Sequence, residues 1–84
     1  MRMQELFQPW PSNGKIEDVT YFEQWDALQL TINDQGRISR RDFELNQTNA
    51  VYKKKALELL REHKGKDVGS VGEVDVEPTV HVVD

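Results

Sequence analysis

Apolar residues recur at helical spacing in two stretches of the chain. Between residues 18 and 30, aromatic and leucine side chains fall three or four positions apart, and Thr20 with Glu23 has the spacing of a capping box. Between residues 50 and 64, a helical wheel gathers on one side Tyr52, Ala56, Leu59, Leu60 and His63. We therefore predict a first helix over about 18–30 and a longer amphipathic helix over 50–64, which Gly65 ends.

The stretch between these two helices allows several interpretations. Apolar and polar residues alternate ahead of Asp34-Gln35-Gly36, which indicates a short strand or a hairpin, although a plain loop between helices fits the same residues. The residues that follow begin with the spacing of a helix cap. A second, short helix is therefore expected over about 40–45.

The sequence from Gly36 to Phe43, Gly-Arg-Ile-Ser-Arg-Arg-Asp-Phe, resembles the second half of an EF-hand calcium loop. The resemblance implies a calcium site, and such a site needs acidic ligands early in its loop. The first three ligand positions would be Thr31, Asn33 and Gln35, which are all uncharged. We therefore expect no calcium binding, and the sequence predicts no other metal or cofactor.

An N-terminal arm is expected over residues 1–16. Pro9 and Pro11 flank Trp10, and prolines at this spacing prevent a helix. Trp10 could insert into a pocket of a partner protein, or it could cover the core of its own domain. The second interpretation is favoured because a small domain seldom leaves an aromatic side chain unused.

The last segment, residues 67–84, is acidic and rich in valine. Four valines share one parity (Val74, Val76, Val80 and Val82), and most residues of the other parity are acidic or polar. This alternation is typical of a half-buried strand, which would pair with residues 66–68 in a hairpin around Gly69 and Gly72. An extended acidic tail is the alternative.

Together these elements predict a small single domain of the α+β class. It would contain an arm (1–16), a helical core (17–66) and a hairpin or tail (67–84), with about three helices in all. Helix, short strand, short helix, long helix and hairpin follow one another in an order that resembles a winged-helix domain. A winged-helix arrangement would place the long helix in the major groove of DNA.

Composition restricts the classes of protein that this chain can represent. With 84 residues it is too short for a two-domain enzyme with a cleft between its lobes. It has no cysteine, and therefore neither disulfides nor thiolate metal sites. No apolar run suits a membrane span or a secretory signal, so we expect a cytoplasmic protein without membrane association.

The net charge of −4 conceals an uneven distribution. Residues 1–36 carry two basic and six acidic side chains, residues 37–66 carry nine basic and four acidic ones, and residues 67–84 carry five acidic ones and no basic one. The positive segment contains the long helix. This asymmetry keeps polyanions among the possible partners.

No nucleophile, phosphate-loop or paired-carboxylate motif is present, so a non-enzymatic binding protein is expected. In the first hypothesis the protein binds nucleic acid through its basic helix and the arginines before it, and Asn46, Gln47 and Asn49 reach base edges. The residues that would contact phosphates are Arg40, Arg41, Lys53, Lys54, Arg61 and Lys64.

The alternative is a protein-interaction module, such as an adaptor, inhibitor or assembly factor of the kind found among phage and mobile-element accessory proteins. It would dock through Trp10 in the arm or through the C-terminal strand.

Overall fold

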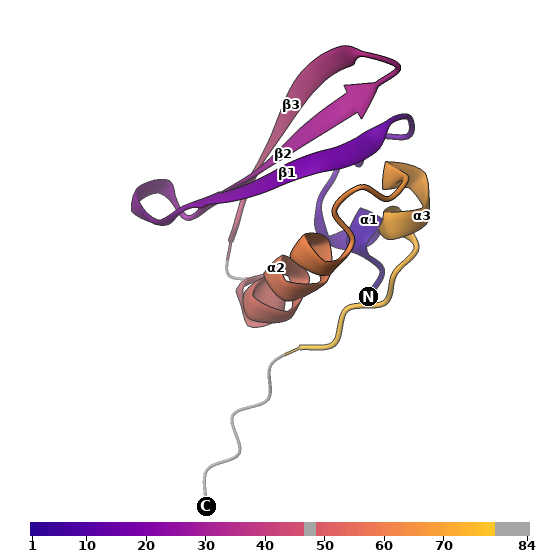
Figure 1. Cartoon of the computed structure of the whole chain (residues 1–84). Coiled ribbons are helices and arrows are strands. Elements are labelled where there is room, and N and C mark those ends of the chain that lie inside the picture. Colours follow the sequence, from indigo (N-terminus) through magenta and orange to yellow (C-terminus); the bar gives the residue numbers. More distant parts are fainter. Residues whose placement is uncertain (47–48, 79–84) are drawn as a thin grey trace, which may run out of the picture.

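A three-stranded antiparallel sheet forms one layer of the molecule, and three helices lie on one side of it (Figure 1). The computed structural model describes residues 1–46 and 49–78. The strands are β1 (Lys15–Phe22), β2 (Ala27–Asp34) and β3 (Arg37–Glu44), and the helices are α1 (Met3–Leu6), α2 (Lys53–Glu62) and α3 (Val68–Gly72). Two short 3-10 turns, η1 (Glu23–Trp25) and η2 (Ala50–Tyr52), precede β2 and α2. The α+β class is therefore confirmed.

The helix expected over 18–30 is wrong, because these residues form most of β1, the turn η1 and the first half of β2. Phe22, Trp25 and Leu28 are spaced as in a helix. In the structure, Phe22 ends β1, Trp25 lies in the 3-10 turn and Leu28 lies in β2, so the same spacing arises from a hairpin. Asp26 ends that turn in the left-handed conformation, with φ of 47°. The chain then returns as β2 beside β1. Residues 17–66 are accordingly not a helical core, although the division of the chain into three segments stays a prediction.

The hairpin interpretation of the stretch after residue 30 is confirmed. β2 and β3 pair from Asp34↔Arg37 to Ala27↔Glu44, and Gln35 and Gly36 between them both have positive φ, of 54° and 89°. Positive φ at both central residues is typical of a two-residue hairpin turn, and glycine adopts it without strain. The short helix over 40–45 and the EF-hand arrangement are both wrong, because residues 37–44 are strand.

The core lies between the sheet and the helices. Strand β2 is central in the sheet, and its alternate residues Leu28, Leu30 and Ile32 are buried. Helix α2 contributes Ala56 and Leu60, so the long amphipathic helix predicted from the sequence is confirmed in position. The remaining buried apolar residues of this cluster are Met3, Leu6, Phe7, Ile16, Val19, Phe43, Val68, Val71 and Val76.

No helix of the described residues lies on the opposite face of the sheet (Figure 1). The central positions of this face are the half-buried Thr20, Gln29 and Thr31 together with the exposed Arg40, which the strand register places side by side across the three strands. Asp42 accepts a hydrogen bond from the Gln29 side chain at 2.9 Å on this face. Such polar residues are compatible with contact to water, which explains why one layer of helices is sufficient.

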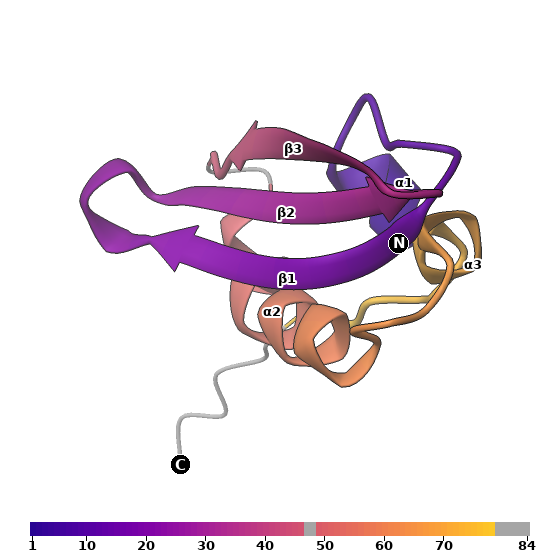
Figure 2. The same cartoon turned by 45° about the horizontal axis from the view of Figure 1, so that its top comes forward.

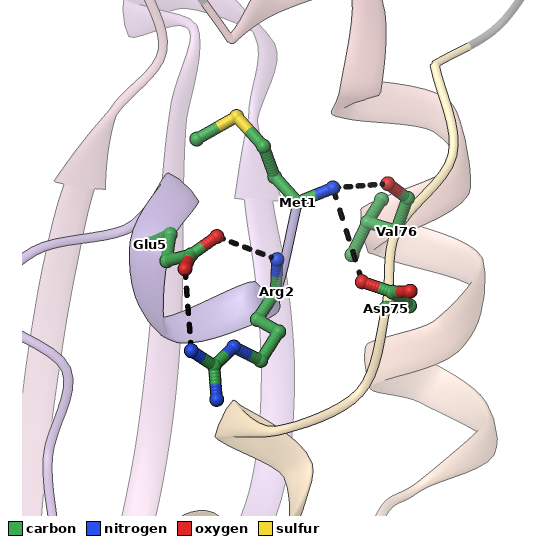
Figure 3. Close-up of polar contacts among 5 residues, drawn as sticks. All are labelled: Met1, Arg2, Glu5, Asp75 and Val76. Carbon is green, nitrogen blue, oxygen red and sulfur yellow. Dashed lines mark hydrogen bonds and ion pairs between the residues drawn. The ribbon is translucent and has the colours of Figure 1, made fainter.

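The hairpin expected after residue 66 is wrong, because residues 68–72 form α3, which Asp67 caps by accepting a hydrogen bond from Gly69 N at 2.9 Å. Residues 74–76 are extended and pair with residues 1–3: Met3 N donates to Val74 O at 2.9 Å and Val76 N to Met1 O at 2.7 Å. The amino group of Met1 also donates to Val76 O at 3.2 Å and lies 3.9 Å from Asp75 Oδ1 (Figure 3). Val76 is buried as the alternation predicted, whereas Val80 and Val82 lie outside the described residues. The described residues follow the order α1, β1, β2, β3, α2, α3, which differs from the winged-helix order expected from the sequence.

The two margins of the sheet differ (Figure 2). The outer edge of β1 is covered near its start by the segment after α2, since Ile16 N donates to Lys66 O at 3.0 Å and Gly65 N donates to Ile16 O at 2.7 Å. Along β3, no backbone hydrogen bond from any other described segment reaches the edge that faces away from β2. Among the described residues, the edge of β1 is therefore covered at Ile16, whereas the edge of β3 is open along its whole length.

We expect Leu60→Ala to lower the free energy of unfolding by about 2–5 kcal/mol, because it leaves a cavity beneath the sheet. Val51→Ala is the control, since Val51 precedes α2 but is 49% exposed, and it should change stability by no more than about 0.5 kcal/mol. Urea denaturation measures both. Equal losses in the two variants would contradict this placement of the core.

Candidate functional site

Two of the lysines that were expected to contact phosphates, Lys53 in α2 and Lys64 just after it, form ion pairs with the β1–β2 hairpin. Lys53 Nζ lies 3.0 Å from Asp26 Oδ1 and 4.5 Å from the centre of the Tyr21 ring. Lys64 Nζ lies 3.3 Å from Asp18 Oδ1. Both ammonium groups are thus neutralised by carboxylates of the β1–β2 hairpin.

The other four expected phosphate contacts are dispersed. Lys54 and Arg61 are exposed on α2, where no described carboxylate lies within ion-pair distance of them. Arg40 and Arg41 are consecutive residues of β3, so they point to opposite faces of the sheet. The structure therefore does not bring the six residues together. Binding of nucleic acid by α2 stays a prediction.

The asparagines expected to read base edges stabilise the loop before α2. Asn46 N donates to Asn49 Oδ1 at 2.8 Å, and Asn49 N donates to Asn46 Oδ1 at 3.2 Å. Asn49 is only 5% exposed, and its amide donates to Leu6 O. Gln47 lies outside the described residues.

Trp10 packs against its own domain. Its ring stacks on Phe43 with 5.9 Å between centres and 16° between planes, and its Nε1 donates to Val68 O at 2.8 Å. Gly72 provides the room, because a Cβ atom there would lie 2.6 Å from Trp10 Nε1. This is the arrangement that the core interpretation of Trp10 predicts. A role in partner binding stays a prediction.

A different tryptophan is exposed. Trp25 has 65% of its surface accessible and lies in η1, at the end of the β1–β2 hairpin that extends beyond the helices (Figures 1 and 2). Every other aromatic side chain of the chain is buried or half-buried. The nearest ring is that of Phe22, at 5.6 Å between centres. We define Phe22, Trp25 and the residues between them as the aromatic tip.

Asp26 fixes the aromatic tip to the rest of the domain. Its carboxylate accepts hydrogen bonds from the Tyr21 hydroxyl and pairs with Lys53 of α2, and its backbone oxygen accepts from Leu45 N at 3.0 Å. These contacts connect the tip with α2 and with the end of β3. Trp25 is therefore exposed on a well-supported turn.

The same contacts change the titration of Asp26. The hydrogen bond from Tyr21, followed by the hydrogen bond and charge of Lys53, lowers the pKa of the Asp26 carboxyl below its ordinary value. The pKa of Lys53 is raised in turn, by its interactions with Tyr21 and Asp26. Both shifts favour the charged forms, so the pair is intact at neutral pH.

The surface around the tip is acidic. Glu23 lies in the tip itself, and Glu44 lies at the adjoining end of β3, opposite Ala27. Neither carboxylate has an ion-pair partner among the described residues. The aromatic tip is thus an exposed indole with negative charge beside it.

At the other end of β3, the arm and the strand enclose a groove of about 330 Å³. Arg37, Ser39 and Arg41, which share one face of β3, line it together with Ile32, Asp34 and residues 9–13. The guanidinium of Arg41 donates to Pro9 O at 3.3 Å. This groove brings together two of the positive side chains that the sequence placed near a helix.

No protein-family model, curated protein or solved structure matches this chain. The site must therefore be interpreted from its own geometry. Within residues 1–46 and 49–78, no three histidine, aspartate or glutamate side chains form a group that could hold a metal ion. In the same residues, no helix is long and apolar enough to cross a membrane.

Sequence reasoning missed the aromatic tip because it assigned Trp25 to the core of a helix. A competing signal was present in β1, where Ile16, Val19, Thr20 and Tyr21 are residue types typical of strands. A strand over these residues would have placed Trp25 in the following turn.

We expect Asp26→Asn to reduce stability at neutral pH and to have little effect in acid. Asparagine tolerates the left-handed conformation of this position, so the change removes mainly the charge. The pKa of the Asp26 carboxyl is lower in the folded protein than in the unfolded chain. The ionised carboxylate therefore stabilises the fold fully above the unfolded pKa of about 3.9, and this stabilisation is lost as the pH falls through the folded pKa.

Thermal melts from about pH 7 to pH 2 measure this difference. The contributions of Asp18 and Glu5, whose pKa values are also lowered, are common to both proteins and cancel in the comparison. A difference in Tm that does not shrink towards low pH would show that the Asp26 carboxylate does not support the tip.

Proposed function

We propose that this protein is a non-enzymatic protein-binding module and that Trp25 is the side chain that enters the partner. The observation that carries the proposal is an indole with 65% of its surface exposed on a turn that several contacts hold in place. The proposal develops the interaction-module alternative from the sequence, but with a different tryptophan.

The use of aromatic side chains elsewhere in the domain supports this proposal. Phe7 and Phe43 are buried in the core, and Trp10 packs against Phe43. Such a small domain gains much of its stability from these rings. Leaving Trp25 in water contributes little to folding, whereas burying it against a partner would remove a large apolar surface from water.

The support of the turn favours binding as well. A side chain on a preordered loop loses little further freedom when the partner binds, so more of the contact energy contributes to affinity. Asp26 provides that order through Tyr21, Lys53 and Leu45. Tryptophan is also among the residues that most often dominate a protein–protein interface.

The chemistry of the partner follows from the surroundings of Trp25. The indole needs an apolar pocket, and Glu23 and Glu44 favour basic side chains at the rim of that pocket. Nucleic acid is the less suitable partner for this surface, because phosphates would be repelled by the same two carboxylates.

We expect Trp25→Ala to weaken partner binding about 30-fold or more, the loss typical of a dominant interface residue, while stability changes little. Labelled wild-type and variant proteins would be used to capture partners from an extract of the source organism. The affinity for the captured partner would then be measured by calorimetry.

Two control variants make the comparison specific. Val51→Ala removes another exposed apolar side chain and should bind as the wild type does, whereas Trp10→Ala should lower Tm because it removes the contact with Phe43. Equal binding by the wild type and Trp25→Ala would refute the proposal. So would tight binding of duplex DNA that is lost in a Lys54→Ala, Arg61→Ala double variant.

A further inference from the structure

We propose that β3 binds an extended acidic segment of a partner protein, which adds to the sheet as a fourth strand. The proposal concerns a surface separate from the aromatic tip and does not depend on Trp25. It rests on the open edge of the sheet and on the distribution of charge along that edge.

The open edge belongs to a full-length strand. β3 has eight residues, all paired with β2 on one side. On its other side, the described residues contribute no backbone hydrogen bond, whereas the corresponding edge of β1 is bonded to residues 65 and 66 at Ile16. An unpaired edge presents N–H and C=O groups at the spacing that an extended peptide satisfies.

Arginines occupy both faces of this edge between residues 37 and 41, ahead of Asp42 and Glu44. Arg37 and Arg41 lie on the face that carries the groove, and Arg40 lies on the uncovered face opposite Thr31. None of the three has a carboxylate within 4.0 Å among the described residues. An added strand with acidic residues at both parities would therefore meet an arginine on either face of the sheet.

This charge selects the occupant. Two copies of β3 pairing edge to edge in antiparallel register would bring arginines close to one another, and like charges on paired strands are destabilising. An acidic segment beside β3 would instead place opposite charges on the paired strands, which is stabilising. A nucleic acid could contact the arginines but could not satisfy the backbone groups of the strand, so the open edge favours a peptide.

The groove gives the added strand a place for its side chains. It has a volume of about 330 Å³ and runs between the arm and the face of β3 that carries Arg37, Ser39 and Arg41. Arg41 is already oriented by Pro9 O, at 3.3 Å. A carboxylate from the added strand could accept hydrogen bonds from these guanidinium groups without a large rearrangement.

The test uses the full-length protein and a synthetic eight-residue peptide, acetyl-Thr-Glu-Val-Glu-Glu-Val-Glu-Thr-amide, at low salt. We expect NMR shifts concentrated at the amides of residues 37–44, with slower hydrogen exchange there. A peptide with lysine in place of every glutamate should not bind. The acidic peptide with alternate backbone nitrogens methylated should also fail, because it keeps the charge but cannot form the strand hydrogen bonds.

Substitutions identify the arginines involved. We expect the affinity for the acidic peptide to fall about threefold in each of the single variants Arg37→Gln, Arg40→Gln and Arg41→Gln, and about 30-fold in the triple variant. These losses correspond to the energy typical of opposite charges on paired strands. Arg61→Gln on α2 is the matched control, with the same change of charge on an exposed helix, and should bind as the wild type does. Trp25→Ala should also bind the peptide normally, so failure here and failure of the aromatic tip are distinguishable.

Several results would overturn the proposal. These are no shift at low salt, equal binding of the methylated or lysine peptide, and shifts confined to α2. Displacement of the peptide from residues 37–44 by an oligonucleotide would favour nucleic acid. Concentration-dependent broadening at the same amides without peptide would favour a second copy of the chain.

Discussion

The central constraint on this molecule is that the helices of residues 1–46 and 49–78 cover only one face of its sheet. Leu28, Leu30 and Ile32 of β2 are buried on that face beneath the helical layer, and the other face carries polar side chains. The placement of everything else follows from this one-sided cover. The connection after α2 covers the start of the β1 edge, and the edge of β3 and the end of the β1–β2 hairpin are left accessible by the described residues.

The elements that could be predicted from the sequence are those with local signals. The amphipathic pattern around Ala56 and Leu60 predicted α2, and Asp34-Gln35-Gly36 allowed a turn between two strands as one of several interpretations. The alternation at Val74 and Val76 also gave the correct inward side of the last described segment. In each case, the information lies within a few residues along the chain.

The remaining features depend on residues that are distant in the sequence. The exposure of Trp25 depends on a turn whose support comes from Lys53 and Leu45, and the spacing of Phe22, Trp25 and Leu28 alone is equally compatible with a helix. The sequence shows that residues 37–66 are basic, but it does not show that Lys53 and Lys64 pair with carboxylates of the β1–β2 hairpin. It also could not show which edge of the sheet stays open, because that depends on the order of the strands.

The uncovered face of the sheet has a consequence for how such a protein can evolve or be engineered. Thr20, Gln29, Thr31 and Arg40 form a nearly continuous patch across three strands, and none of them belongs to the apolar core. Their side chains can be exchanged for other strand-forming residues at little expected cost in folding. The domain thus resembles a display scaffold, in which a library of substitutions at four neighbouring positions could be selected for new ligands while the helical layer preserves the backbone.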